Sequence, residues 1–282
     1  MRTIHVGSVP IGENYPLVLI AGPCVIESLD LVLQVADTVS KICAKLKIPY
    51  IFKSSYLKDN RSSSLSFQGP GLEEGLKILE KVKNEIGVPV LSDVHDQHNM
   101  KAAAEVLDVI QIPAYLSMQT SLTLAAARTG KVINVKKGQF LDPHDVKNIV
   151  GKIEGEGNYN ILLTERGSCF GYHNLVVDMR SFKIMREIGY PVVFDATHSI
   201  RIYGIPSSDP RGGVPQFVPA LSRAAVAAGI DAIFIETHPH CSDALCDAAS
   251  MWPLDLLEPL LLQLKDIDEM VRSQKEIELE VK

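Results

Sequence analysis

The sequence predicts a single α/β domain over residues 1–282, a (β/α)8 TIM barrel with a short N-terminal hairpin and a C-terminal helix. Short apolar runs rich in β-branched residues recur eight times, and amphipathic stretches separate them. Runs of this kind that alternate with helices form parallel sheets, and eight strands can close such a sheet into a barrel. The length of 282 residues is also close to the roughly 250 that this fold needs.

Each of the eight apolar runs ends in polar or charged residues. In chain order they are LVLIAGPCVIES, PYIFKSSY, VPVLSDVHD, VIQIP, VINVKKGQF, ILLTERG, PVVFDATHS and AIFIETHP. Helical spacing of apolar residues predicts helices between them, which include residues 72–86, 100–107, 122–129, 143–153 and 217–228. Residues 1–13 predict a small hairpin that caps the barrel bottom, and residues 254–282 predict one or two helices with breaks at Pro253 and Pro259.

An open, doubly wound sheet is the alternative fold for alternating strands and helices. No G-x-G-x-x-G motif follows the first strand. Polar residues also end nearly every strand, whereas a doubly wound sheet gathers them at one crevice. Both observations favour the barrel.

The composition argues against several classes of protein. With 46% hydrophobic and 22% charged residues, the chain can bury a sizeable core. A net charge of −6 without a block of Lys and Arg argues against a nucleic-acid partner. The first apolar stretch, residues 17–21, is too short for a signal peptide or a membrane span, and five cysteines are an odd number. We therefore expect a cytoplasmic protein with no membrane partner.

The C-terminal ends of barrel strands meet at one mouth, so the residues there form a chemical inventory. Cations end three of the runs, at Lys53, Lys136 and Arg166. A barrel interior strongly disfavours unpaired charge, so these cations need internal carboxylate partners or an anionic ligand. Because Lys58 and Arg61 add further cations in the loop after the second strand, we expect a small substrate that carries both phosphate and carboxylate.

A second group at the strand ends has the chemistry of metal ligands. Its members follow the first, seventh and eighth strands, which are neighbours across the barrel seam: Cys24, His198, Glu236 and Asp247. Thiolate, imidazole and two carboxylates suit a divalent Fe²⁺, Zn²⁺ or Mn²⁺ ion. A lone cysteine or histidine at such a position is also compatible with ordinary core packing. The segment from His238 to Cys246 lacks paired C-x-x-C spacing, which argues against a separate structural zinc site.

Several long motifs together resemble one enzyme family. They are IAGPCVIES, KSSYLKDNRSS, GPGLEEGL, SDVHD, VIQIPAYLSMQT, VINVKKGQF, LLTERGSCFGYHNLVVDMR, VFDATHS, and IETHP followed by CDAAS. From about residue 17 to 260 the chain is similar to the metal-dependent branch of the 3-deoxy-D-manno-octulosonate 8-phosphate synthase family. The resemblance implies a homotetrameric barrel enzyme that condenses phosphoenolpyruvate with arabinose 5-phosphate and water, releases phosphate, and feeds lipopolysaccharide synthesis.

The resemblance also implies roles for individual residues. The phosphate of phosphoenolpyruvate falls to Lys136 and Arg166, and its carboxylate to Lys53, Ser55, Lys58 and Gln111. The motif for arabinose 5-phosphate is Asn60, Arg61 and Ser62, with Arg61 reaching its phosphate across a subunit interface. The implied metal ligands are Cys24, His198, Glu236 and Asp247. The catalytic candidates are Cys24, Lys58, Asp93 and His198.

Three positions give different indications about the metal. Cys24 and Ala249 match the metal-dependent branch, in which a cysteine follows Ala-Gly-Pro. Cys246, just before Asp247, matches the metal-independent branch instead. Dependence on a metal therefore stays open at this stage.

Three other functions remain alternatives. The sister enzyme that makes 3-deoxy-D-arabino-heptulosonate 7-phosphate from erythrose 4-phosphate usually carries a Lys-Pro-Arg-Thr motif after the second strand, and Lys-Asp-Asn-Arg-Ser-Ser stands there instead. A metal-dependent sugar-phosphate aldolase or isomerase would need no phosphoenolpyruvate. A catalytically inactive scaffold would lack a mouth cation or ligand, and none is missing.

Overall fold

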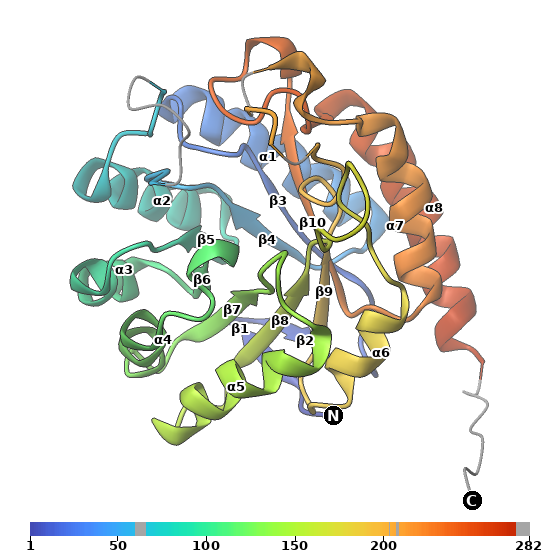
Figure 1. Cartoon of the computed structure of the whole chain (residues 1–282). Coiled ribbons are helices and arrows are strands. Elements are labelled where there is room, and N and C mark those ends of the chain that lie inside the picture. Colours follow the sequence, from blue (N-terminus) through green and yellow to red (C-terminus); the bar gives the residue numbers. More distant parts are fainter. Residues whose placement is uncertain (60–65, 203, 207–208, 275–282) are drawn as a thin grey trace, which may run out of the picture.

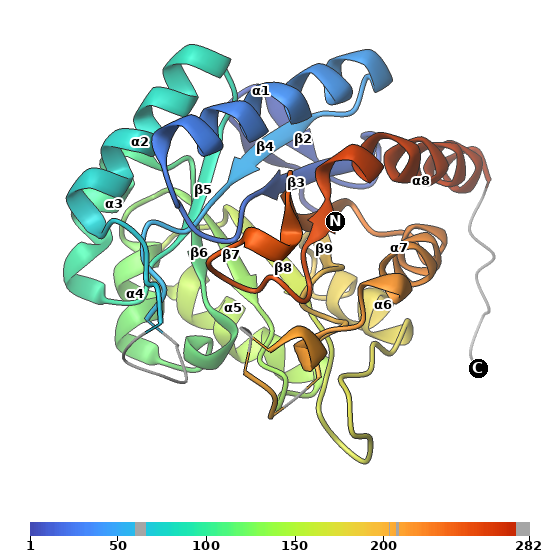
Figure 2. The ribbon, with the colours of Figure 1, turned by 90° about the horizontal axis from the view of Figure 1, so that it is seen from above.

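The computed structural model describes residues 1–59, 66–202, 204–206 and 209–274. In this part of the chain, eight parallel strands form a sheet that closes on itself, because β10 pairs with both β9 and β3. Seen from above, the helices surround the strands as an outer layer (Figure 2). The closed sheet confirms the predicted (β/α)8 barrel and excludes the open doubly wound alternative.

The eight predicted apolar runs are the eight barrel strands. These are β3 (Val18–Gly22), β4 (Tyr50–Lys53), β5 (Val90–Asp93), β6 (Val109–Ile112), β7 (Val132–Lys136), β8 (Ile161–Glu165), β9 (Val192–Asp195) and β10 (Ala232–His238). A short β11 (Trp252–Pro253) pairs with the end of β10. Every residue of the eight strands is buried, which explains why they read as continuous apolar runs of Val, Ile and Leu.

Helices follow the strands in sequence and cover the barrel (Figure 1). They are α1 (Leu29–Leu46), α2 (Leu72–Ile86), α3 (Met100–Val106), α4 (Thr120–Ala127), α5 (Val146–Gly155), α6 (Arg180–Arg186), α7 (Val218–Ala227) and α8 (Leu257–Arg272). Short 3-10 helices are η1 (Gln97–Asn99), η2 (Ala114–Leu116), η3 (Pro143–Asp145), η4 (Pro210–Gly212), η5 (Pro215–Phe217), η6 (Cys241–Asp243) and η7 (Leu254–Leu256).

One predicted boundary in the C-terminal segment is wrong. Pro259 was expected to break a helix, but it lies in the first turn of α8. A proline is tolerated there because the backbone N–H that it lacks has no partner within the helix at that position. Helix α8 is tied to the barrel by Asp268, whose Oδ2 accepts a hydrogen bond of 3.0 Å from the backbone N–H of Leu17. No helix in the described residues is long and apolar enough to cross a membrane.

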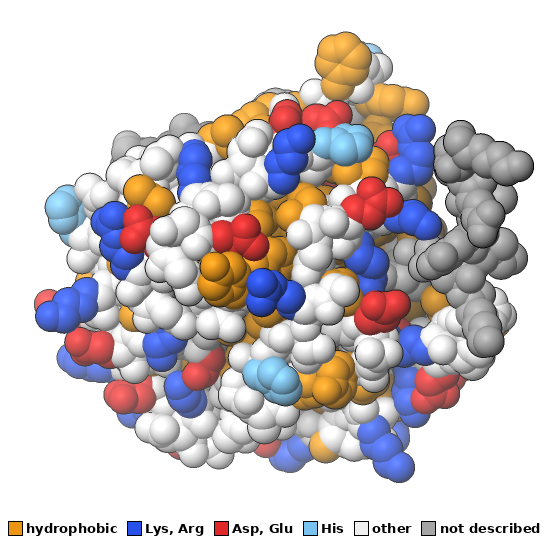
Figure 3. Space-filling view, turned by 90° about the horizontal axis from the view of Figure 1, so that it is seen from below, with side chains coloured by type: hydrophobic (Ala, Val, Ile, Leu, Met, Phe, Trp, Pro, Cys, Tyr) orange, Lys and Arg blue, Asp and Glu red, His pale blue; other side chains and the backbone are white. Residues whose placement is uncertain are grey.

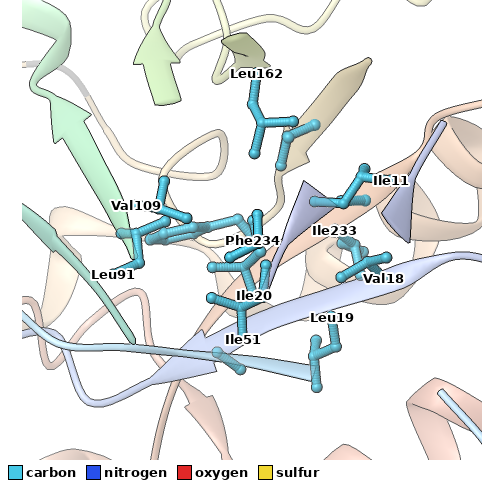
Figure 4. Close-up of a cluster of buried hydrophobic side chains, with 14 of the residues drawn as sticks. Ile11, Val18, Leu19, Ile20, Ile51, Leu91, Val109, Leu162, Ile233 and Phe234 are labelled. Carbon is cyan, nitrogen blue, oxygen red and sulfur yellow. The ribbon is translucent and has the colours of Figure 1, made fainter. Parts of the chain in front are cut away.

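The predicted N-terminal hairpin is confirmed as β1 (Ile4–Val6) paired antiparallel with β2 (Val9–Ile11). Ile11 is fully buried and lies near Val18 and Ile233, which are close to the starts of their strands (Figure 4). The backbone N–H of Arg2 also donates to the carbonyl of Gly189, just before β9. The hairpin therefore closes the end of the barrel at which the strands begin.

Apolar side chains fill the barrel above the hairpin. Ile20, Ile51, Leu91 and Val109 come from neighbouring strands and are fully buried (Figure 4). Because this packed core leaves the strand ends as the polar part of the interior, the fold places the charged residues of the strands at the opposite end from the hairpin.

Candidate active site at the barrel mouth

The three predicted cations lie buried at the mouth. Lys53 ends β4, Lys136 ends β7, and Arg166 follows β8. Lys53 Nζ pairs with Glu236 Oε1, and Lys136 Nζ pairs with Asp195 Oδ2. The carboxylate partners considered from the sequence are thus present for both lysines.

Arg166 differs from the two lysines. It forms no ion pair with any residue that the structure describes, and its buried Nη1 has no hydrogen-bond partner among them. Burial lowers the pKa of its guanidinium. A buried donor of this kind carries a desolvation cost of roughly 1–3 kcal/mol or more, which a bound anion would relieve. Arg166 is therefore the clearest sign of an anionic ligand.

Phe234 supports the two lysines from β10. The Nζ of Lys136 lies 3.4 Å from the centroid of its ring, and the Nζ of Lys53 lies 5.4 Å from it. An aromatic face attracts cations at such distances. Phe234 precedes Glu236 by two residues, so the alternation of a strand places both side chains on the same face. Phe234 was not predicted as a site residue, although this spacing could have indicated it.

The charges of the mouth depend on one another. Burial lowers the pKa of Lys136 to about 8, against the opposing effect of Asp195. Burial would raise the pKa of Asp195, but the charges of His198 and Lys136 lower it well below its usual range. Asp195 therefore stays ionised, whereas Lys136 loses its proton at a lower pH than an ordinary lysine does.

A third ion pair joins the loop after β4 to the end of β5. Lys58 Nζ lies 3.6 Å from Asp93 Oδ2, and the Ser55 hydroxyl donates to Asp93 Oδ1 at 2.5 Å. Burial would raise the pKa of Asp93, but the charges of Lys58 and Lys53 lower it well below its usual range. For Lys58, burial acts to lower the pKa, but nearby anions, Asp93 first, raise it. Both members of this buried pair are therefore held in their charged forms.

Gln111, at the end of β6, is held by a chain of hydrogen bonds inside the barrel. Asn134 Nδ2 donates to Gln111 Oε1 at 2.9 Å, and the Thr164 hydroxyl donates to Asn134 Oδ1 at 2.6 Å. Because the amide oxygen of Gln111 is engaged, its N–H groups are left as donors for a ligand. Asn134 and Thr164 were not predicted, since an isolated polar residue within an apolar strand carries no motif.

Lys137 organises the loops after β7 and β8. Its fully buried Nζ donates to the carbonyls of Gly138 and Leu141 and to the Ser168 hydroxyl at 3.0–3.3 Å. These contacts fix the backbone on either side of the mouth next to Lys136 and Arg166. The doubled lysine of VINVKK was the only signal for this role in the sequence.

The four predicted metal ligands lie at the seam formed by β9, β10 and β3, in two groups that share Asp247: His198 and Glu236 belong to one, and Cys24 with Cys246 belongs to the other. His198 Nε2 lies 3.6 Å from Glu236 Oε2 and 3.5 Å from Asp247 Oδ2. Cys24 Sγ lies 3.5 Å from the same Asp247 oxygen. Ligands about 2.0–2.3 Å from one tetrahedral ion lie about 3.3–3.6 Å from each other, so His198, Glu236 and Cys24 each have at least one neighbour at such a distance, although Cys24 is grouped with Cys246 and not with His198.

The hydrogen bonds around the cluster also fit a cation. Glu236 Oε2 is buried and has no hydrogen-bond partner among the described residues. His198 Nδ1 contacts Asp195 Oδ2 at 2.9 Å, so a ring that binds a cation through Nε2 would keep its proton on Nδ1. The lone pair on Nε2 then faces two carboxylates. This carboxylate–histidine arrangement is the usual support of a metal-binding imidazole.

Cys246 lies beside the ligand set. Its Sγ is 2.7 Å from that of Cys24, and Cys24, Cys246 and Asp247 form a second group with metal-ligand geometry. Burial, followed by the hydrogen bond with Cys246 and the charge of Asp247, raises the pKa of the Cys24 thiol well above its usual value. A metal that binds Cys24 would displace this proton.

Two further sequence predictions concern residues 60–62 and the segment after β10. Asn60, Arg61 and Ser62 lie outside the residues that the structure describes. The segment after β10 contributes Cys246 and Asp247 to the cluster above, and its described residues form no separate group of three metal ligands.

Comparisons with known proteins agree on one family. Residues 3–273 match the model of the DAHP synthetase I family. Proteins named 2-dehydro-3-deoxyphosphooctonate aldolase are similar over nearly the whole chain. One from Trichlorobacter lovleyi is 56% identical over 96% of this chain and 99% of its own. One from Geobacter sp. strain M21 is 57% identical over the same shares. One from Acidithiobacillus ferrooxidans is 52% identical over 93% of each chain.

The pKa of Lys136 predicts how anion binding at the mouth depends on pH. Lys136 is charged below its pKa of about 8 and neutral above it. Sulfate, which keeps its charge over this range, should therefore bind about tenfold more weakly at about pH 9 than at about pH 7. Isothermal titration calorimetry measures this. Lys136→Arg should remove most of the dependence, because arginine stays charged. Equal affinities at both pH values in the parent protein would contradict the assignment.

Proposed function

The chain belongs to the DAHP synthetase I family, and from this membership and the barrel mouth we propose that it is a 3-deoxy-D-manno-octulosonate 8-phosphate synthase. This transferase condenses phosphoenolpyruvate with D-arabinose 5-phosphate and water, and it releases phosphate. The names of the similar proteins support this reading, because they specify a phosphorylated octonate and an aldol reaction. The motifs imply that the product supplies lipopolysaccharide synthesis.

The observation that carries the proposal is that buried cations lie beside residues with metal-ligand chemistry. The cations are Lys53, Lys58, Lys136 and Arg166, and the other residues are Cys24, His198, Glu236 and Asp247. Lys136 and the buried Arg166 offer one point charge and one bidentate fork to the phosphate of phosphoenolpyruvate. We assign its carboxylate to Lys53, Lys58 and the N–H groups of Gln111. Fixed cations hold an anionic substrate in one orientation, which lowers the entropic part of the barrier.

The condensation needs controlled proton transfer at the aldehyde and at the water. The methylene carbon of phosphoenolpyruvate attacks the aldehyde, water adds to the resulting cationic carbon, and phosphate leaves with its carbon–oxygen bond broken. We assign Lys58 and Asp93 to proton movement at these two positions, because this buried pair lies at the mouth with its charged atoms 3.6 Å apart. His198 and Cys24 take part as ligands of the metal centre.

Cys24, His198, Glu236 and Asp247 are the residues that would hold a divalent Fe²⁺, Zn²⁺ or Mn²⁺ ion. Such an ion supplies orientation and polarisation of an oxygen ligand. The separations of 3.5–3.6 Å and the buried Glu236 Oε2 support this set. Cys246 Sγ lies 2.7 Å from Cys24 Sγ, and both are grouped with Asp247.

Substrate choice separates the proposal from its nearest alternative. With phosphoenolpyruvate present, phosphate release should be faster with arabinose 5-phosphate than with erythrose 4-phosphate by at least about 100-fold in kcat/KM. A colorimetric phosphate assay measures both. The reverse preference would identify a heptulosonate synthase, and sugar-phosphate cleavage without phosphoenolpyruvate would identify an ordinary aldolase.

Removal of the metal tests the role of Cys24. The purified protein should contain about one metal ion per chain, lose phosphate release by at least about tenfold on chelation, and regain it with Mn²⁺, Fe²⁺ or Zn²⁺. Cys24→Ala should bind metal poorly, whereas Cys43→Ala, in α1 and remote from the mouth, should bind it normally. Metal content by mass spectrometry and activity are compared. Full activity of the metal-free parent protein would contradict the metal centre.

We also propose a homotetramer, supported by exposed apolar side chains near the mouth. Phe170, Tyr172, Phe140 and Tyr115 are 91%, 69%, 57% and 52% exposed. They follow adjacent strands, and their loops touch where the backbone N–H of Cys169 donates to the carbonyl of Gln139. Large exposed apolar groups of this kind mark interaction surfaces. On the face shown in Figure 3, basic and acidic side chains are interspersed, with some apolar surface near the centre.

We also propose a cytoplasmic location. In support, none of the five cysteines forms a disulfide.

The mass in solution tests this assembly. Sedimentation equilibrium should give four times the 30.9 kDa of one chain. Phe170→Ser combined with Tyr172→Ser should lower the mass, whereas Met270→Ser on α8 should leave it unchanged. A parent protein that sediments as a single chain would contradict the proposal.

A further inference from the structure

Arg201, in the loop after β9, contacts one of the proposed metal ligands from outside the cluster. Its Nη1 lies 2.5 Å from Asp247 Oδ1, and its side chain is 18% exposed. The other oxygen, Oδ2, lies 3.5 Å from both His198 Nε2 and Cys24 Sγ. The two oxygens of Asp247 therefore face different partners, and the guanidinium holds the one that points away from the cluster.

Glu236 is arranged in the same way. Lys53 pairs with its Oε1, while its Oε2 lies 3.6 Å from His198 Nε2. Each carboxylate of the cluster thus has one oxygen on a cation and one oxygen toward the centre. Such pairing fixes which oxygen is offered to an ion, and it offsets part of the negative charge that two carboxylates and a thiolate bring together.

The backbone gives Arg201 a fixed position relative to Asp247. Arg201 and Gly213 form an antiparallel bridge, and the backbone N–H of Val214 donates to the carbonyl of Ile200 at 3.0 Å. At Gly213 a Cβ would lie 2.5 Å from the carbonyl oxygen of Ala249, so a glycine lets this loop approach the turn that carries Asp247. Asp247 itself has φ of +50°, a conformation that a side-chain residue adopts only when its surroundings hold it.

From these contacts we propose that Arg201 is a positioning residue for the metal centre: it holds Asp247 so that Oδ2 alone is offered to the ion. The inference rests on the proposed metal site of Cys24, His198, Glu236 and Asp247. It adds a residue outside that ligand set and makes the loop after β9 part of the support of the centre. Removal of an outer partner of a metal ligand typically weakens metal binding by about 10- to 100-fold.

Binding of Co²⁺ to the purified, metal-free protein tests this role. Arg201→Met should weaken Co²⁺ affinity by about 10- to 100-fold and change the visible d–d spectrum, because Asp247 is then free to reorient or to bind through both oxygens. Arg201→Lys keeps the charge without the fork and should recover part of the affinity. Arg211→Met is the matched control, since Arg211 lies in the same loop, is 82% exposed and pairs with Asp209. It should bind Co²⁺ as the parent protein does.

The possible results are distinguishable. Equal Co²⁺ affinity and spectrum in the parent protein and Arg201→Met would overturn the role of Arg201 and leave the metal site standing. A lower melting temperature with unchanged Co²⁺ binding would make Arg201 purely structural and also overturn it. If the parent protein binds no Co²⁺, both the metal site and the role of Arg201 fall. If Arg201→Met does not fold, Arg201→Gln takes its place with the same expected loss.

Discussion

Charge buried at the mouth of a closed barrel is the constraint on which the site depends. Strand ends converge there, so Lys53, Lys136 and Arg166 are removed from water by the same closure that forms the core. Isolated buried charges cost far more than a fold can tolerate, so each must meet an opposite charge or a ligand. Glu236 pairs with Lys53, and Asp195 pairs with Lys136. The buried Nη1 of Arg166 has no hydrogen-bond partner among the described residues. The fold thereby creates an affinity for small anions.

The order of strands decides how the cations and the donor cluster share this space. Because β10 lies between β9 and β3, His198, Glu236 and Cys24 meet at one seam. Glu236 belongs to both groups, since one oxygen pairs with Lys53 and the other faces His198. A change at either group therefore acts on the other. The chemistry we propose needs such coupling, because one substrate is anchored by cations and its partner is oriented by an ion.

The sequence predicted the parts of this arrangement that follow from strand position. Eight apolar runs in the sequence predicted the eight buried strands. The polar residues at the ends of these runs included Cys24, His198 and Glu236. It did not predict residues whose role depends on a neighbour in space. Phe234 looks like any core aromatic until two lysines are placed over it, and Arg201 looks like a surface loop residue until Asp247 approaches it. The prediction that Pro259 breaks a helix was wrong for a local reason: a proline in the first turn of a helix and a proline that ends a helix look alike in a sequence.

A crystal structure of the protein with Mn²⁺ and phosphoenolpyruvate, with anomalous data at the manganese edge, tests the central claim most directly. We expect one anomalous peak within coordination distance of Cys24, His198, Glu236 and Asp247. We also expect the phosphate on Lys136 and Arg166 and the carboxylate toward Lys53 and Gln111. A ligand bound away from these cations, or manganese bound elsewhere with the four donors unliganded, would contradict this expectation.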